Sequence, residues 1–127
     1  MPANPEIPCI DHVQITVPYG SESRARAFYC DVLGLVEIDK PESLTGRGGF
    51  WLQIGSIQLH IGTEPDWDRL QTKAHVAYRV SDLGAWRARV ESAGCLIEKS
   101  VAIPGFDRFE TRDPFGNRLE FIQSIGE

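Results

Sequence analysis

Residues 9–18, CIDHVQITVP, and residues 73–82, KAHVAYRVSD, place a histidine at the same point of two alternating apolar–polar stretches. Alternation with a period of two is typical of a β-strand with one buried face. In each stretch the apolar side chains share one face of the strand, and the histidine lies on the other. His12 and His75 are 63 residues apart, so the two strands indicate two copies of one structural unit.

The first copy continues with helical spacing. Residues 21–34, SESRARAFYCDVLG, place their apolar side chains on one face of a predicted helix. Ser21 or Ser23 is expected to cap its start, and Gly34 to end it. The copy is completed by a short strand, a loop and a hairpin, at residues 35–38, 41–49 and 50–62.

The second copy repeats this order. It is predicted to contain a strand, a helix, a second strand and a hairpin, at residues 74–80, 81–94, 95–99 and 107–123. Both copies therefore predict βαβββ, and residues 1–127 are expected to form one α+β domain. Its parts are module one at about residues 9–62, a linker at 63–73 and module two at about 74–124.

Composition narrows the class of protein. The 127 residues have a net charge of −5 and no Lys/Arg-rich run, which argues against nucleic acid or an anionic membrane as partner. No apolar run approaches the roughly 20 residues of a membrane helix. Cys9, Cys30 and Cys95 are scattered and odd in number, so they are expected to be reduced core cysteines of a cytoplasmic protein.

The predicted sheet face that points away from the helices collects polar side chains, at His12, Gln58, His60, His75 and Glu120. His12 matches His75 between the copies, and Gln58 matches Glu120 at an offset of 62 residues. Two imidazoles with one carboxylate form a recurrent transition-metal triad. A solvated polar face of the sheet is the alternative explanation.

The duplicated pattern, with IDHVQI at 10–15, AHVAYRV at 74–80 and DPFGNRLEF at 113–121, resembles the vicinal oxygen chelate superfamily over about residues 9–124. The resemblance implies that the modules form a cup-shaped mixed β-sheet with helices on its outer face. It also implies one divalent metal ion (Fe, Mn, Co, Ni or Zn), a small-molecule substrate and a homodimer. Carried over by motif, the metal ligands are His12, Gln58, His75 and Glu120.

For activity, the resemblance implies a glyoxalase-like enzyme whose metal stabilises an oxyanion, of the lyase, isomerase or thiol-transferase type. Neutral Gln58 stands where glyoxalase I has a second glutamate, which favours an anionic, oxygen-bearing substrate. An extradiol-type dioxygenase is one alternative. A non-catalytic protein that binds an antibiotic or another small molecule, as the bleomycin-binding members do, is the other.

Catalytic and substrate-binding roles are predicted for further residues from their positions on the strands. Glu110 stands where relatives place a catalytic tyrosine, and it alternates onto one face with Arg108 and Arg112. It is predicted to be an ionised carboxylate and a base, with Arg108 holding an anionic group of the substrate. Substrate contacts are also predicted for Gln14, Trp51 and His60, although Trp51 is equally compatible with a core position. Residues 46–49, GRGG, open no helix and are expected to form a rim of the site.

Overall fold

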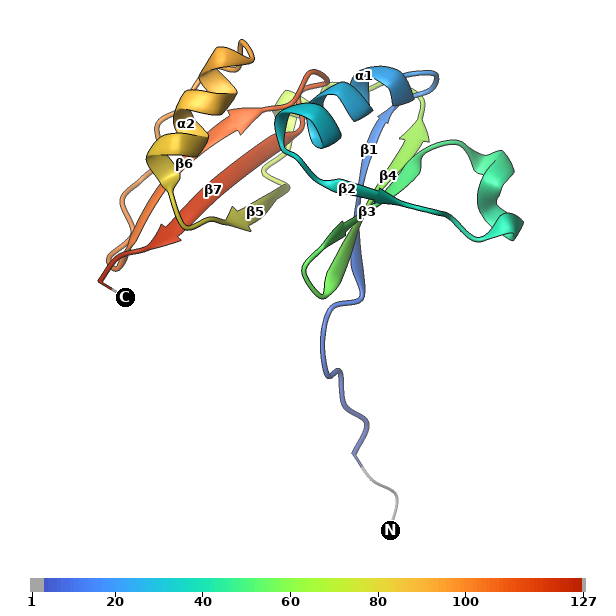
Figure 1. Ribbon diagram of the computed structural model, residues 1–127, viewed down its shortest axis with the longest axis horizontal. Coiled ribbons are helices and arrows are strands. Elements are labelled where there is room, and N and C mark those ends of the chain that lie inside the picture. Colours follow the sequence, from blue (N-terminus) through green and yellow to red (C-terminus); the bar gives the residue numbers. More distant parts are fainter. Residues whose placement is uncertain (1–3, 127) are drawn as a thin grey trace. The chain divides into compact units, whose positions relative to one another are not determined.

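The computed structural model describes residues 4–126, which form seven strands in two mixed sheets (Figure 1). The chain divides into two compact units between Pro65 and Asp66, inside the predicted linker of residues 63–73. Each unit combines one sheet with helical segments, so the α+β class is confirmed. A single cup made from both modules stays a prediction.

Unit 1 has the predicted order of elements. It contains β1 (His12–Pro18), α1 (Glu22–Arg26), the π-helix η1 (Ala27–Val32), β2 (Val36–Ile38), the 3-10 helix η2 (Glu42–Arg47), β3 (Phe50–Ile54) and β4 (Ile57–Glu64). The strands lie in the order β1-β4-β3-β2, with β1 parallel to β4 and the other neighbours antiparallel. The helical segment covers one face of this sheet (Figure 1).

The core of unit 1 lies between that helical segment and the sheet. Alternate strand positions turn inward, and Val17, Leu52 and Leu59 are almost fully buried. Phe28 and Tyr29 are neighbours in sequence and both are buried. They lie in the π-helix, whose wider turn lets consecutive residues share the inner face. The helix begins after Ser21 as predicted, but no side-chain hydrogen bond caps it.

Unit 2 repeats the plan with one strand fewer. It contains η3 (Arg69–Gln71), β5 (His75–Arg79), α2 (Leu83–Ser92), β6 (Phe106–Arg112) and β7 (Arg118–Ser124). The strand order is β5-β7-β6, with β5 parallel to β7 and β6 antiparallel to it. The Asp82 side chain accepts a hydrogen bond of 3.0 Å from Ala85 N and caps α2, which packs against β6 and β7.

The strand predicted at residues 95–99 is wrong, apart from one residue. Glu98 forms an isolated bridge with Glu110 of β6, through hydrogen bonds of 2.8 and 3.4 Å. The pairing does not continue toward residue 95, where the Leu96 carbonyl accepts a side-chain hydrogen bond from Thr111 Oγ1 at 2.7 Å. A side chain therefore satisfies a group that a longer strand would have used.

Residues 41–49, which we call the rim, are more ordered than the predicted loop, because η2 occupies most of them. The rim closes at Gly49, which has a φ of +77°, and a Cβ there would lie 2.1 Å from the carbonyl oxygen of Ile61 in β4. The Glu22 carboxylate also accepts a hydrogen bond from Gly49 N at 3.2 Å. The end of the rim is therefore fixed against unit 1.

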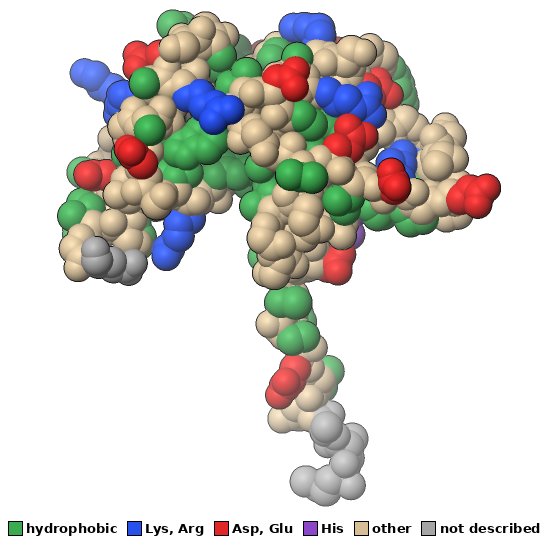
Figure 2. All heavy atoms as spheres, viewed as in Figure 1, with side chains coloured by type: hydrophobic (Ala, Val, Ile, Leu, Met, Phe, Trp, Pro, Cys, Tyr) green, Lys and Arg blue, Asp and Glu red, His purple; other side chains and the backbone are tan. Residues whose placement is uncertain are grey.

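The segment before β1 adds little to the core. Residues 4–11 have no helix or strand, and Figure 2 shows hydrophobic side chains along this extended stretch. Ile7 is 92% exposed and Ile10 is 61% exposed.

Candidate functional site

The face of the unit 1 sheet opposite α1 collects the predicted site residues of this unit. His12 and Gln14 of β1 pair in register with Gln58 and His60 of β4. Trp51 of β3 pairs with His60 from the other side. Because side chains alternate along each strand, all five lie on the same face. The position of Trp51 is therefore outside the core.

His60 is enclosed by two other rings. Its ring centroid lies 4.1 Å from that of His12, with 13° between the planes, and 3.9 Å from that of Trp51, with 4° between the planes. We call His12, His60 and Trp51 the ring stack. His60 is only 5% exposed. Burial lowers the pKa of His60 below its usual value, and the charge of His12 acts in the same direction.

His60 also orients the proposed ligand Gln58. His60 Nε2 lies 2.9 Å from Gln58 Oε1. The amide oxygen can only accept, so Nε2 carries the proton and donates it. His60 was predicted to contact substrate, and the structure gives it this further role of holding an amide in place. Gln14 lies over Gly62, where a Cβ would come within 2.9 Å of Gln14 Nε2.

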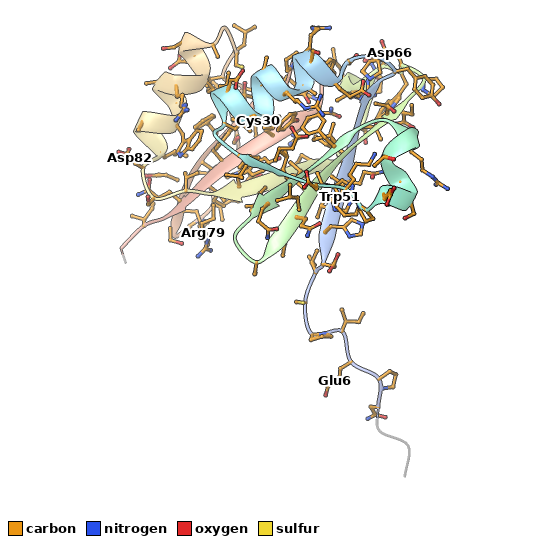
Figure 3. All side chains as sticks on the ribbon, turned by 45° about the vertical axis from the view of Figure 1, so that its right-hand side comes forward. Glu6, Cys30, Trp51, Asp66, Arg79 and Asp82 are labelled. Carbon is orange, nitrogen blue, oxygen red and sulfur yellow. The ribbon has the colours of Figure 1, made fainter. Side chains whose placement is uncertain are left out.

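The same face of unit 1 borders a pocket of about 670 Å³, a size that suits a small molecule. It is lined by the ring stack, by Gln14 and Gln58, and by Lys40, Leu44 and Arg47 from the rim side. Figure 3 shows Trp51 close to the rim. Lys40 Nζ donates a hydrogen bond of 2.7 Å to the carbonyl of Gly48, which fixes its ammonium group at this edge.

Unit 2 brings together the other predicted residues. His75 of β5 and Glu120 of β7 face each other, with 3.1 Å between His75 Nε2 and Glu120 Oε1. Glu120 is 6% exposed. The nearest guanidinium nitrogen of Arg108 lies 3.4 Å from the same carboxylate oxygen. Arg108 also donates to Val101, so its guanidinium is already held within unit 2.

The Glu110 side chain is buried, and both of its carboxylate oxygens accept hydrogen bonds. Its Oε1 accepts hydrogen bonds from Ser100 at 3.2 Å and Arg108 at 3.3 Å, and its Oε2 accepts one from Arg118. The hydrogen bond from Arg118 is the main reason that the pKa of Glu110 lies below its usual value, which favours the ionised carboxylate. Arg112, two residues along β6, pairs with Glu98 at 3.1 Å.

Both candidate imidazoles are oriented in the same way. His12 Nδ1 lies 2.9 Å from the Asp11 carboxylate, and His75 Nδ1 lies 2.9 Å from the carbonyl of Lys73. These oxygens only accept, so each Nδ1 carries a proton, and each Nε2 points toward the outward face. Histidine ligands of metals are commonly held this way by an acceptor on the far nitrogen.

His75 Nε2 faces an oxygen of Glu120 that only accepts, and in a neutral imidazole with its proton on Nδ1 this nitrogen is an acceptor as well. Two acceptors 3.1 Å apart need a proton or a cation between them. Adjacent ligands of a transition metal bound at about 2.1 Å are separated by roughly this distance. His75 and Glu120 are thus an imidazole and a carboxylate, two of the ligand types that divalent metals use.

The strand register gives a different repeat correspondence from the predicted one. His12 pairs with Gln58, whereas His75 pairs with Arg118. Glu120 pairs with Ala77, as His60 pairs with Gln14. The structural counterpart of Glu120 is therefore His60, and the predicted match of Glu120 with Gln58 is off by two residues.

Three residues at the two faces were not predicted from the sequence: Asp11, Lys40 and Arg118. Asp11 directly precedes His12, so a search for acceptors beside each candidate ligand could have found it. Lys40 borders the pocket from the end of β2, and nothing in the local pattern singles it out. The pairing of Arg118 with Glu110 depends on the alignment of β6 with β7, which the local sequence pattern does not give.

Among residues 4–126, no three His, Cys, Asp or Glu side chains form a group able to hold a metal ion. Each unit offers two of the four predicted ligands. None of the helices in the described part of the chain is long and apolar enough to cross a membrane.

Comparison with known families identifies one match that spans most of the chain. The model of the Glyoxalase/Bleomycin resistance protein/Dioxygenase superfamily matches residues 10–121. Glyoxylase I 4 of Arabidopsis thaliana is 26% identical over 121 residues, which are 87% of this chain and 68% of the plant protein.

Solved structures agree with this match. A glyoxalase family protein from Bacillus anthracis superposes with a TM-score of 0.87 and 38% identity, over 96% of this chain and 99% of that protein. Lactoylglutathione lyase from Agrobacterium tumefaciens superposes with a TM-score of 0.71 and 20% identity, over 92% and 94% of the two chains. The second similarity concerns the fold alone.

Proposed function

Because this chain belongs to the Glyoxalase/Bleomycin resistance protein/Dioxygenase superfamily, we propose that it is a glyoxalase-like enzyme that uses one divalent metal ion. Its substrate is a small, anionic, oxygen-bearing molecule. The observation that carries the proposal is the shared orientation of His12 and His75. In both, an acceptor holds Nδ1 and leaves Nε2 available as a ligand.

The proposed ligands, carried over from the family motif, are His12, Gln58, His75 and Glu120. Fe, Mn, Co, Ni and Zn all accept imidazole and carboxylate ligands, so the donor types do not choose among them. When bound, the metal acts as a Lewis acid that stabilises negative charge on a substrate oxygen. Gln58 contributes no charge, which leaves the site more attractive to an anion than one with a second carboxylate.

The remaining roles belong to the protein alone. His60 holds Gln58 Oε1 by its hydrogen bond, and Asp11 and the Lys73 carbonyl hold the two imidazoles. Glu110 is the proposed base, and its lowered pKa makes it a weak one, so it suits only a proton that is already acidic. Arg108, 3.3 Å from Glu110, is the proposed contact for an anionic group of the substrate.

A non-catalytic binding protein is the second candidate. It is favoured by the unit 1 pocket, which combines three flat rings with a neutral amide and is large enough for a small molecule. A binder needs this pocket but no metal. Metal content and turnover therefore separate the two candidates.

The test combines elemental analysis with an activity panel. The protein is purified without chelator, its metal content is measured, and it is assayed with hemithioacetals, with epoxides plus thiols, and with catechols, before and after chelation. About one metal per chain and a chelator-sensitive activity are expected. His75→Gln should lose metal, whereas Arg79→Gln, an exposed change on the same strand, should keep it. A stable protein that takes up no divalent metal overturns the proposal.

We further propose that the enzyme is a cytoplasmic homodimer. β1 and β2 are the edges of the unit 1 sheet, β5 is an edge of the unit 2 sheet, and such edges pair readily with another chain. Cys9, Cys30 and Cys95 are unpaired thiols, as a reducing compartment requires. Light scattering should give about 28 kDa, twice the 14.2 kDa of one chain. A single 14 kDa species at about 10 µM contradicts the dimer.

A further inference from the structure

We propose that the unit 1 pocket binds an organic anion that carries a flat, conjugated group, with the flat group stacked on Trp51 and the anionic group paired with Arg47 and Lys40. This rests on the proposed function in one respect, because the pocket also contains the proposed ligands His12 and Gln58. It goes further by naming the substrate class and the residues that select it.

The anionic group follows from the charges that line the pocket. Lys40 and Arg47 are cations at its rim, and Asp11 is the one carboxylate among its lining residues. Asp11 is occupied by His12 Nδ1 at 2.9 Å. The pocket of an acidic protein therefore presents an excess of positive charge, which attracts anions.

Both cations have donors to spare. Lys40 uses one of its three N–H groups on the carbonyl of Gly48, so two remain. The Arg47 guanidinium has no hydrogen bond or ion pair to any described residue, and its five donors remain open. A carboxylate is the small group that an unpaired guanidinium binds best, through two parallel hydrogen bonds.

The flat group follows from the ring stack. His12, His60 and Trp51 lie nearly parallel at 3.9–4.1 Å spacing, and Trp51 is the end of the stack nearest the rim. One face of Trp51 is covered by His60, and its indole also lines the pocket, together with Leu44 of the rim. A planar conjugated group extends such a stack favourably, whereas a puckered ring cannot.

Three probes of similar size test the two features separately. Cinnamate is flat and anionic, 3-cyclohexylpropanoate is anionic but not flat, and cinnamamide is flat but uncharged. Binding is measured by calorimetry on chelator-treated protein, without turnover, so that a failure of the metal-dependent function leaves the result unaffected. Cinnamate is expected to bind with a Kd below roughly 1 mM, and each of the other two at least about tenfold more weakly.

Variants then assign the contacts. Arg47→Gln and Trp51→Leu should each weaken cinnamate binding by roughly tenfold, and Arg47→Gln should leave cinnamamide binding unchanged. Arg79→Gln removes an exposed arginine of unit 2 and should change nothing. Arg47 is exposed on the rim, so its substitution tests the proposal even if Trp51→Leu fails to fold. Equal binding of the three probes, no binding of cinnamate, or no effect of Arg47→Gln overturns it.

Discussion

His75 and Glu120 meet across β5 and β7 with 3.1 Å between Nε2 and Oε1, although both atoms are acceptors when the imidazole is neutral. The Lys73 carbonyl fixes the imidazole proton on the other nitrogen. Two acceptors this close repel each other unless a proton or a cation lies between them. In unit 1, Asp11 orients His12 in the same sense, which makes Asp11 testable on its own.

Asp11→Asn should lower the affinity for a divalent metal by roughly 10- to 100-fold, because the carboxylate no longer holds His12 Nδ1–H. Calorimetric titration of the chelated protein with Co²⁺ or Zn²⁺ measures the change. Asp107→Asn is the matched control, since Asp107 is an exposed aspartate on β6. Equal affinities for both variants would remove Asp11 from the site.

Glu110→Gln should reduce kcat by roughly 10²-fold on any panel compound that is turned over, while the metal content stays the same. The substitution keeps the shape of the side chain but removes the carboxylate base. It also removes the ion pair with Arg118, so Glu98→Gln, which breaks the Arg112 pair, serves as the control. An unchanged kcat would leave Glu110 a structural anion that holds two arginines.

Gly49→Ala should lower the free energy of unfolding by about 2 kcal/mol or more. The residue has a φ of +77°, and the added Cβ would lie 2.1 Å from the carbonyl oxygen of Ile61. Gly46→Ala, on the same rim, meets nothing within 4 Å and should be nearly neutral. Urea unfolding of both variants measures the difference. Equal stability would mean that the end of the rim is not fixed against β4.

The three thiols should react at different rates. Burial raises the pKa of Cys30, with Glu37 and Asp31 acting in the same direction, and burial also raises the pKa of Cys95. The thiolate is the nucleophile, so a raised pKa reduces the reactive fraction at pH 8, and reactivity should keep increasing at higher pH. Cys9 is exposed and should be alkylated first by iodoacetamide. Mass spectrometry of brief labelling at pH 7–9 gives the order, and faster labelling of Cys30 than Cys9 contradicts it.

The strands and hairpins were predictable because alternation is a local signal. The rows of inward side chains in β1, β4 and β7 can be identified from sequence alone, and so can the opposite face with its polar residues. The strand predicted at residues 95–99 was wrong because the Leu96 carbonyl, which a longer strand would pair with β6 backbone, is taken by the Thr111 side chain. The π-helix of residues 27–32 was also not predicted, since its wider turn depends on how Phe28 and Tyr29 pack.

For the site, the sequence predicted which sheet face carries the polar residues, but not which residues pair between neighbouring strands. A shift of two residues between parallel strands leaves every side chain on its original face, so alternation alone cannot detect it. This explains why Glu120 corresponds to His60 and not to Gln58. The contact of Arg118 with Glu110 was not predicted either, because it depends on the pairing of β7 with β6.

The two modules share one backbone arrangement, but the side chains on their outward faces differ. The face of unit 1 carries aromatic rings and amides, and the face of unit 2 carries a network of arginine–glutamate ion pairs. Inward positions determine whether the chain folds, and outward positions determine what it binds. Substitutions at exposed outward positions of β1 and β3 should therefore change binding at little cost in stability, whereas Glu110 and Glu120 on β6 and β7 are buried and paired, and replacing them should also destabilise the fold. One duplicated backbone plan thus carries two outward faces of different chemistry.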